Sequence, residues 1–334
     1  MTSNRWLRAI AGLVVAGVFL ALLAGSVSWG EVRQILARAD WRILLLGLAA
    51  LTLDLAARIA RWWLMLRAAD PSLSFTACVR PFLGSLALNN TVPFRAGDVV
   101  RVFGFRRALR APAAHVAGTV MLERMLDLLV LLLILFAGLL GTSSVFPRAF
   151  TLAAAAAGAV TLASLAALTA FPQAVTGTLQ LVVTRLFSGR TWLPSVHRII
   201  AQVTAALALL RSRRAAAVLA LSVLAWVLEG AVFASVAWAL HLPVPWVAPW
   251  LALAAATLAT LLPSSPGYVG TFDYFAALGL SAYGAPAAPA AAFALLTHLL
   301  LWLPVTAAGL GALAFGWRSR KVPESIQPDS RVPA

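Results

Sequence analysis

The stretch LLPSSPGYVGTFDY, from Leu261 to Tyr274, decides the fold, because prolines and glycines interrupt a chain that is apolar on both sides. The apolar run 247–262 leads into it, and another apolar segment, ending near Tyr283, leads out. In such surroundings we expect the break to lie at membrane depth. Irregular backbone is tolerated there only where it is buried in protein or lines a watery cavity. The interrupting residues are Pro263, Pro266, Gly267 and Gly270.

A second stretch, LGSLALNNTVPFRAGDVVRVF at residues 83–103, has the same plan. Moving it forward by 170 residues places Pro93 on Pro263 and Gly97 on Gly267, which gives the same P-x-x-x-G spacing. Two hydrophobic segments interrupted by Gly or Pro, at corresponding places in two halves, are typical of a transporter's substrate site. The match is short, so coincidence is the alternative interpretation.

Composition places the chain among polytopic membrane proteins. Its 334 residues are 62% hydrophobic and only 11% charged, with a mean hydropathy of +0.91. The net charge of +15 comes from arginines scattered between apolar runs, which indicates positive-inside anchoring rather than nucleic-acid binding. The single Cys78 excludes an internal disulfide, and the only lysine, Lys321, excludes a P-loop or Schiff-base lysine. We expect no cofactor and no metal.

The pattern predicts an all-α polytopic membrane protein with about six full transmembrane helices and two broken re-entrant helical hairpins in an inverted repeat. One integral membrane domain is expected over 1–317, with pseudo-repeats at about 43–141 and 215–315. A disordered cytoplasmic tail is expected over 318–334. The six expected spans are 10–27, 43–66, 113–140, 149–171, 215–240 and 287–315.

The arginines also predict an orientation in a bacterial inner membrane. Placing both termini and the arginine-rich segment 173–214 in the cytoplasm makes the first hairpin open on the cytoplasmic side. The second hairpin lies in a stretch, 241–301, that has no Lys or Arg, and it falls on the opposite side. The arginines of 31–42 then lie outside, which counts mildly against this orientation. Opposite orientations of two similar hairpins are typical of an inverted repeat.

Ionisable residues within the predicted spans must avoid lipid, because each costs about 2.5–3.5 kcal/mol at the bilayer centre. Asp54, Arg58 and Arg61 lie at i, i+4 and i+7 and form one stripe on a helix. A purely structural role, in which Asp54 pairs with Arg58, is the favoured interpretation of this stripe. A structural role is also the favoured interpretation for His298. Glu229 has no obvious local partner, and both roles stay open for it.

A second group of charges lies around the first break. Glu123, Arg124 and Asp127 share one helix sector, and Asp98 and Arg101 are spaced to pair at i and i+3. A structural pair between Glu123 and Arg124 is the alternative to a site role here. The free N–H ends of the half-helices favour anions, and arginine beside the break can hold a phosphate with forked hydrogen bonds. Asn89 and Asn90 either cap the broken helix or bind a headgroup. Trp62, Trp63, Trp246, Trp250 and Trp317 are interpreted as interfacial residues.

Four motifs follow one another along the chain: G-D-x-x-R at 97–101, E-R-x-x-D at 123–127, the acidic Glu229, and P-x-x-P-G-x-x-G-x-x-D from Pro263 to Asp273. At these residues the chain resembles the family of lysylphosphatidylglycerol synthase transmembrane regions, which are flippase-like membrane proteins. The resemblance covers about residues 6–317. The family more often has glutamate where Asp98 and Asp273 stand, so this chain keeps the charge on a shorter side chain.

The resemblance implies movement of a lipid or lipid-linked molecule between leaflets, without identifying the lipid. A phospholipid, a hopanoid or a polyprenyl-linked sugar all fit. In two-domain members the aminoacyl transfer belongs to a separate soluble domain, and the segment after Trp317 is too short to hold one. We therefore expect that this chain is not a synthase and not an enzyme.

The first functional hypothesis is a lipid flippase or scramblase, either passive or driven by an ion or proton gradient, with Asp98, Glu123, Asp127 and Glu229 as proton-carrier candidates. The alternative is a secondary transporter of a small anionic solute. Less favoured are an intramembrane transferase that uses Glu123 or His298 as a base and a structural partner of another membrane enzyme.

Expected partners are anionic or phosphate-headed membrane lipids and, as a further option, a lipid-modifying enzyme encoded nearby. The oligomeric state is left open. The candidate substrate-binding residues are Asn89, Asn90, Pro93, Arg95, Gly97, Asp98, Arg101, Glu123, Arg124, Asp127, Glu229, Pro263, Pro266, Gly267, Gly270 and Asp273.

Overall fold

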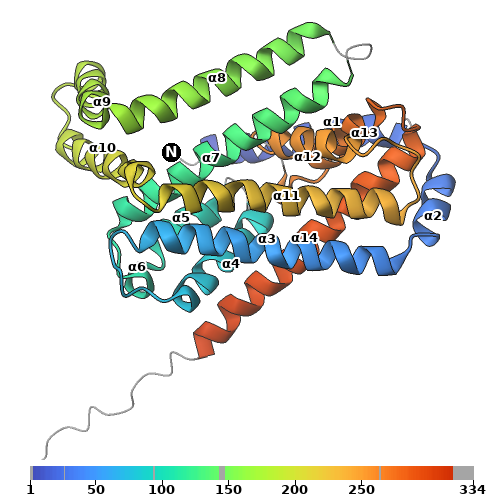
Figure 1. Cartoon of the computed structure of the whole chain (residues 1–334), viewed down its shortest axis with the longest axis horizontal. Helices are drawn as coiled ribbons and strands as arrows, with labels where there is room; N and C mark the ends of the chain where they lie inside the picture. The colour runs from blue at the N-terminus through green and yellow to red at the C-terminus, as the bar shows by residue number, and fades with distance from the viewer. Residues whose placement is uncertain (1–2, 26, 93–94, 143–146, 263–264, 319–334) are drawn as a thin grey trace, which may run out of the picture.

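The computed structural model describes residues 3–25, 27–92, 95–142, 147–262 and 265–318, and within these ranges the chain is built from helices without a strand (Figure 1). Pro93, Pro263 and all but the first residue of the predicted tail 318–334 lie outside the described residues. The all-α prediction is confirmed for the described chain.

Four helices are long and apolar enough to cross a membrane: α3 (Trp41–Leu66), α8 (Arg148–Ala170), α11 (Ala215–Ala239) and α14 (Ala287–Arg318). The bent pair of α1 (Ser3–Gly25) and α2 (Trp29–Ala37) makes a fifth if it counts as one span. The sixth predicted span, α7 (Ala113–Leu140), has 28 residues but carries three charged side chains. Length and composition of the described helices therefore support four or five spans, not six.

Both predicted breaks are present, and each divides a short helical hairpin. The first hairpin consists of α4 (Phe75–Thr91) and α5 (Ala96–Phe103), and the short α6 (Arg106–Leu109) follows it. The second consists of α12 (Ala248–Ala259), the 3₁₀ turn η2 (Pro266–Tyr268) and α13 (Thr271–Ser281). Left-handed backbone reverses the chain in both, with φ of 51° at Arg95 and 70° at Gly267.

The two glycines of the P-x-x-x-G match have different structural roles. Gly97 lies in the first turn of α5, where a Cβ would overlap the backbone carbonyl of Ser85 in α4. Gly267 has a positive φ, which glycine adopts without the steric cost that a Cβ brings. The offset of 170 residues therefore does not pair equivalent glycines, and this part of the sequence interpretation is wrong.

Helices α3 and α11 run antiparallel. The Asp40 N–H at the start of α3 donates to the Ala239 carbonyl at the end of α11 over 2.9 Å. At the other end of the pair, Arg61 Nη1 donates to Ser222 Oγ over 3.1 Å. Because α4 follows α3 and α12 follows α11, the two hairpins enter the bundle from opposite ends, as Figure 1 shows.

Each hairpin packs on long helices of both halves of the chain. The first arm of each packs on the last long helix of the other half, α4 on α14 and α12 on α7. The second arm packs on the last helix of its own half, α5 on α7 and α13 on α14. Glycine allows these close approaches, since a Cβ at Gly309 of α14 would overlap the carbonyl of Leu83 in α4. Both halves therefore depend on each other for their packing.

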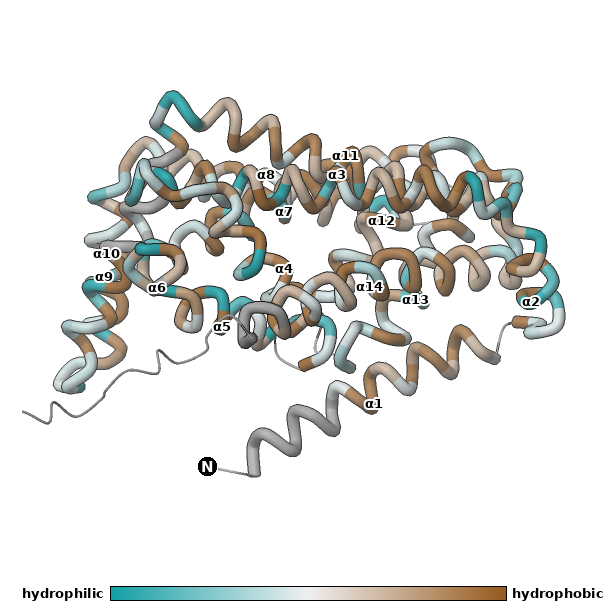
Figure 2. Tube along the Cα trace, turned by 90° about the horizontal axis from the view of Figure 1, so that it is seen from below, coloured by the Kyte–Doolittle hydropathy of each residue, from teal (hydrophilic) through white to brown (hydrophobic). Residues whose placement is uncertain are grey.

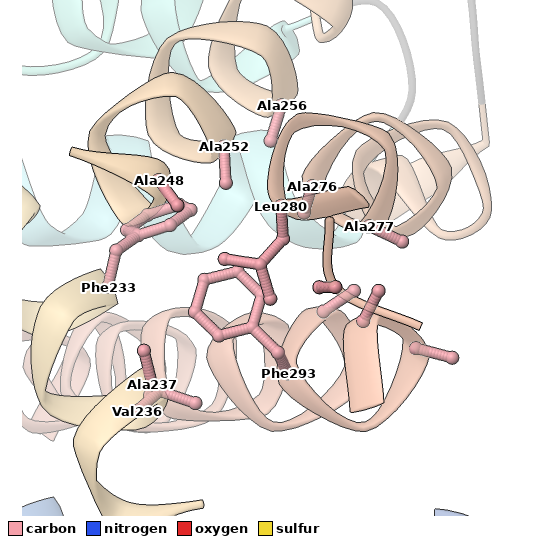
Figure 3. Close-up of a cluster of buried hydrophobic side chains, with 14 of the residues drawn as sticks. Phe233, Val236, Ala237, Ala248, Ala252, Ala256, Ala276, Ala277, Leu280 and Phe293 are labelled. Atoms are coloured by element: carbon pink, nitrogen blue, oxygen red, sulfur yellow. The ribbon is translucent and has the colours of Figure 1, made fainter. Parts of the chain in front are cut away.

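Small side chains form much of the core around the second hairpin. Phe233, Leu280 and Phe293 are fully buried there, surrounded by alanines of α12, α13 and α14 (Figure 3). Without a strong hydrophobic force between helices in lipid, such small residues favour association by letting backbones approach closely. The alanine content thus has a structural use, which composition alone does not indicate.

Hydrophilic residues gather toward the two ends of the bundle, around α2 at one end and around α6 and α9 at the other (Figure 2). The second end holds most of the arginine-rich segment, folded as α9 (Pro172–Leu186), α10 (Leu193–Leu207) and a 3₁₀ turn at Ala208–Arg211. Helix α10 packs on α7. The arginine-rich segment is therefore helical and in contact with the bundle.

The antiparallel arrangement predicts which loops share a side of the membrane. In a Cys78→Ala background, cysteines at the exposed Ser72 (before α4) and His241 (before α12) should react with a membrane-impermeant maleimide from opposite sides. The measurement is labelling of whole cells compared with inverted vesicles. Labelling of both positions from one side would contradict the opposed hairpins.

Candidate functional site

A cavity of about 430 Å³ lies where the two breaks meet in the middle of the bundle. Residues of both hairpins and of helices α3, α7, α11 and α14 form its wall. Its polar lining residues are Asp54, Arg58, Asn90, Arg95, Arg124, Asp127, Trp226, Glu229, Thr257, Thr260, Tyr268, His298 and Trp302. The volume lies within the range of small-molecule pockets.

The two breaks touch each other directly through Arg95. Its Nη2 donates to the backbone carbonyl of Thr260 over 3.3 Å and to the Thr260 hydroxyl over 3.1 Å. Its guanidinium lies 6.0 Å from the ring centre of Tyr268. Among the described residues no carboxylate lies within ion-pair distance of Arg95. The cavity therefore has a cation whose charge no carboxylate neutralises directly.

One guanidinium, that of Arg58, forms ion pairs with two carboxylates at the seam of α3 and α11, which is the line along which these two helices pack. Arg58 Nε donates to both oxygens of Asp54, over 2.7 and 2.9 Å, and Arg58 Nη2 donates to Glu229 Oε2. The ring of Trp226 lies 4.5 Å from the Arg58 guanidinium and covers it. The predicted Asp54–Arg58 pair is confirmed, and the partner of Glu229 is found on the other half of the chain.

Two further ion pairs hold α7 to its neighbours deep in the bundle. Arg61 is fully buried and donates from Nη1 to Asp127 Oδ1 over 2.7 Å, and Trp226 Nε1 also donates to this oxygen over 3.2 Å. Arg101, equally buried, donates to Glu123 Oε1 over 3.0 Å. A buried arginine without its carboxylate would cost several kcal/mol, so each pair ties two helices together.

The pairs within the motifs differ from the expected ones. Arg124 donates to both oxygens of Asp98, over 3.1 and 3.2 Å, whereas Arg101 reaches Glu123 instead of Asp98. Adjacent helix residues such as Glu123 and Arg124 project in different directions, so each finds its partner on α5. The predicted Asp98–Arg101 and Glu123–Arg124 pairs are therefore wrong, and the correct pairs cross between the two motifs.

Trp62 and Asn89 also take more internal roles than expected. Trp62 is buried, its Nε1 donates to the Thr119 hydroxyl over 3.1 Å, and its ring centre lies 4.8 Å from the Arg101 guanidinium. It is not an interfacial residue. Asn89 Oδ1 accepts from the Asp98 N–H over 3.2 Å and its Nδ2 donates to Asp98 Oδ1 over 3.1 Å. Asn89 thus caps α5, while Asn90 lines the cavity.

The second break is fixed by Asp273 and His298. Asp273 Oδ2 accepts from the Gly270 N–H over 2.9 Å, which caps α13, and Asp273 Oδ1 lies 2.8 Å from His298 Nδ1. His298 Nε2 lies 2.9 Å from the carbonyl oxygen of Gly267. Pro266 begins the turn that carries this carbonyl. The motif residues of the second hairpin therefore shape the break, and Gly267 reaches the cavity wall.

Corresponding positions of the two halves carry corresponding charges. Asp98 and Asp273 are each the third residue of the second arm, and each contacts a basic residue of the next long helix, Arg124 or His298. The offset between the acids is 175 residues and between the bases 174. Asp54 and Glu229, the two acids on Arg58, are also 175 apart.

Several residues of this site were left unassigned or missed by the sequence analysis. The sequence predicts a structural stripe of Asp54, Arg58 and Arg61, and it does not single out Tyr268, Thr260 or Trp302. The signal present in the sequence is the recurrence of charged residues at an offset of 174–175, which aligns the acids and indicates His298. Within the described residues no group of three His, Cys, Asp or Glu side chains is arranged to hold a metal ion.

Residues 9–309 match the family described as the lysylphosphatidylglycerol synthase TM region. The chain belongs to this family. Together with its long apolar helices, the membership makes it a multi-pass membrane protein of the flippase-like, transporter kind. The synthase in the family's description does not by itself indicate catalysis by this membrane region. No curated protein sequence matches the chain significantly.

The buried pair of Arg61 and Asp127 predicts a strong effect on stability. Arg61→Leu removes the hydrogen-bonded cation of the buried Asp127 and leaves it only the more distant Arg124, at 3.9 Å, so it should lower the free energy of unfolding by about 3–5 kcal/mol. Adding Asp127→Leu should recover part of this loss, because the second variant removes the stranded charge. Arg33→Leu, at an exposed position of α2, serves as the control and should change stability by no more than about 0.5 kcal/mol. Unfolding in mixed micelles measures all three, and equal losses for Arg61 and Arg33 would contradict the assignment.

Proposed function

We propose that the protein moves a phosphate-headed lipid between the leaflets of a bacterial inner membrane and acts as a transporter rather than an enzyme. The cavity at the meeting point of the two breaks receives the headgroup. The observation that carries the proposal is Arg95, a cavity-lining cation that joins both breaks and has no carboxylate within ion-pair distance among the described residues. Its guanidinium suits the forked hydrogen bonds that a phosphate accepts.

A route for acyl chains is supported by exposed apolar residues beside the cavity. Leu261 lines the cavity, and 61% of its surface is exposed. Val92, at the end of α4, and Leu262 are exposed as well. In a membrane these leucines and valine face lipid, so a headgroup in the cavity can keep its tails in the bilayer. A fully enclosed cavity would favour a soluble anion instead.

We further propose that residues 43–141 and 215–315 form an inverted repeat. The order of elements is the same in both: a long helix, a broken hairpin and a second long helix. The antiparallel α3 and α11, the opposite entry of the hairpins and the charge offset of 174–175 residues support it. Such repeats let a central site open alternately to either side of a membrane.

Both termini are proposed to face the cytoplasm. Helix α14 runs toward the end of the bundle that holds α6 and the arginine-rich α9–α10 segment, and α1 begins toward the same end (Figure 1). Cytoplasmic loops carry the excess of arginine in multi-pass proteins. The arginines of α2 and its loop lie at the other end, where Glu31 and Asp40 accompany them. These two acids lower the net positive charge of that end.

Reconstitution into vesicles with a headgroup-labelled anionic phospholipid tests the function. The protein should accelerate exposure of the inner-leaflet label to an external quencher, and Arg95→Gln should slow this by about 10- to 100-fold, the value of one charge-assisted hydrogen-bonded contact. Arg42→Gln, an exposed arginine at the start of α3, is the matched control and should transport normally. An unchanged rate for Arg95→Gln would remove this residue from the mechanism. Uptake of a soluble phosphate ester without lipid movement would favour the solute transporter.

A further inference from the structure

His298 makes two hydrogen-bonding contacts, one through each ring nitrogen, and each contact needs a hydrogen. A neutral histidine beside an ionised carboxylate has only one hydrogen for both. The Gly267 carbonyl can only accept a hydrogen bond, so the contact with His298 Nε2 requires a hydrogen on Nε2. The contact between His298 Nδ1 and Asp273 Oδ1, at 2.8 Å, requires another hydrogen, on either the nitrogen or the oxygen. A neutral imidazole has only one N–H, so the pair holds an additional proton.

Two arrangements satisfy this count. Either His298 is an imidazolium beside an ionised Asp273, or a protonated Asp273 donates to Nδ1 of a neutral His298. The remaining Asp273 oxygen accepts from the Gly270 N–H in both. The pair has no net charge in either arrangement, which suits its partly buried position among apolar helices.

Loss of this proton must break one of the two contacts. If the remaining imidazole hydrogen lies on Nδ1, the Gly267 carbonyl loses its donor. If it lies on Nε2, the lone pair of Nδ1 faces the carboxylate. An ionised carboxylate is a stronger acceptor than a carbonyl, so the remaining hydrogen favours Nδ1 and the Gly267 carbonyl loses its donor. Gly267 is the left-handed residue at the centre of the second break, so the proton controls the contact between the break and His298 of α14.

We propose that the Asp273–His298 pair is a proton-binding site whose proton fastens the second break, at Gly267, to α14. Through this fastening the protein couples proton binding to the opening of the central cavity. The coupling to transport rests on the proposed function, whereas the proton site itself does not. The ligand is a proton exchanged with water, and no covalent or redox step is involved.

The charged groups around the pair are few and come from several elements. Asp54 and Arg58 of α3, Glu229 of α11, Arg124 and Asp127 of α7, and Arg95 and Tyr268 of the two breaks share the cavity with His298. The ring of Phe272 covers the imidazole at 4.8 Å. Helix α2, at one end of the bundle in Figure 1, also packs on α14. Its Glu31 and Arg33 are exposed.

The other acids of the site are poorer proton carriers, because each is held by arginine. Asp98, Glu123 and Asp127 accept from Arg124, Arg101 and Arg61, and a proton added to any of them would remove the closest carboxylate from an arginine whose charge is permanent. Glu229 shares Arg58 with Asp54. Asp273 is the acid whose basic partner can itself lose a proton.

Nuclear magnetic resonance tests the proton site without transport. In reconstituted protein with ¹⁵N-labelled histidine and ¹³C-labelled aspartate, His298→Gln identifies the His298 signals. We expect a pH at which the pair gains one proton, seen as a doubly protonated imidazole or a protonated Asp273 carboxyl, and we expect Asp273→Asn to abolish that step. A neutral His298 beside an ionised Asp273 at every pH between 5 and 9 would overturn the proposal.

Accessibility of the break supplies a second readout. In a Cys78→Ala background, a cysteine at the exposed Val269 should react faster with maleimide as the pH rises through the titration of the pair. His298→Gln should make this rate independent of pH apart from the thiol's own ionisation, which a cysteine at exposed Ser72 corrects for. His241→Gln, an exposed histidine of the loop before α12, is the control and should behave as the unchanged protein. A pH dependence that persists in His298→Gln would contradict the fastening role.

Lipid movement under an imposed pH difference completes the test. The rate should respond to the pH difference in the unchanged protein and in His241→Gln, and lose that response in His298→Gln and Asp273→Asn. If the pair titrates but no lipid moves in any protein, the proposed function fails while the proton site is supported. If lipid moves and His298→Gln keeps its response to the pH difference, the coupling fails while the proposed function stands.

Discussion

Arg58 joins the two halves of the molecule, and the arrangement of the hairpins depends on that junction. It is bound by Asp54 on its own helix and by Glu229 on α11, at the seam where the two helices run antiparallel. Charges of this kind are too costly to face lipid, so the seam must be internal and its register is fixed. Once α3 and α11 are antiparallel, the hairpins that follow them enter from opposite ends and meet in the middle.

The breaks are tolerated because protein groups satisfy the backbone that the helices release. Asn89 and Asp273 cap the second arms, Arg95 binds the carbonyl of Thr260, and His298 contacts the carbonyl of Gly267. In lipid such groups would lack partners. The side chains that repair the breaks also line or adjoin the cavity, so the same residues stabilise the fold and form the site. A change in their protonation or binding therefore acts on the backbone directly.

The two breaks differ in chemistry although their geometry corresponds. At the first, Asp98 contacts an arginine, whose charge is permanent, while at the second, Asp273 contacts a histidine, which can release its proton. One hairpin is thus held by a fixed ion pair and the other by a titratable one. Under the proposed function, the second hairpin is therefore the one whose contact with the last long helix a proton can control.

Sequence alone determined the helical class, the long apolar helices and both breaks, because hydropathy and the Pro/Gly interruptions are local properties. The bounds predicted for α7 and α14 agree closely with the structure, and α7 begins at Ala113 as expected. Only the tertiary structure decided the ion pairs, since Arg58 and Glu229 lie 171 residues apart and neighbouring charges such as Glu123 and Arg124 project toward different partners. It also shows that Asp98 and Asp273, 175 residues apart, make corresponding contacts, which the 170-residue spacing of Pro and Gly does not predict. The physical reason is that spacing between glycines cannot show which of them turn the chain and which allow close packing.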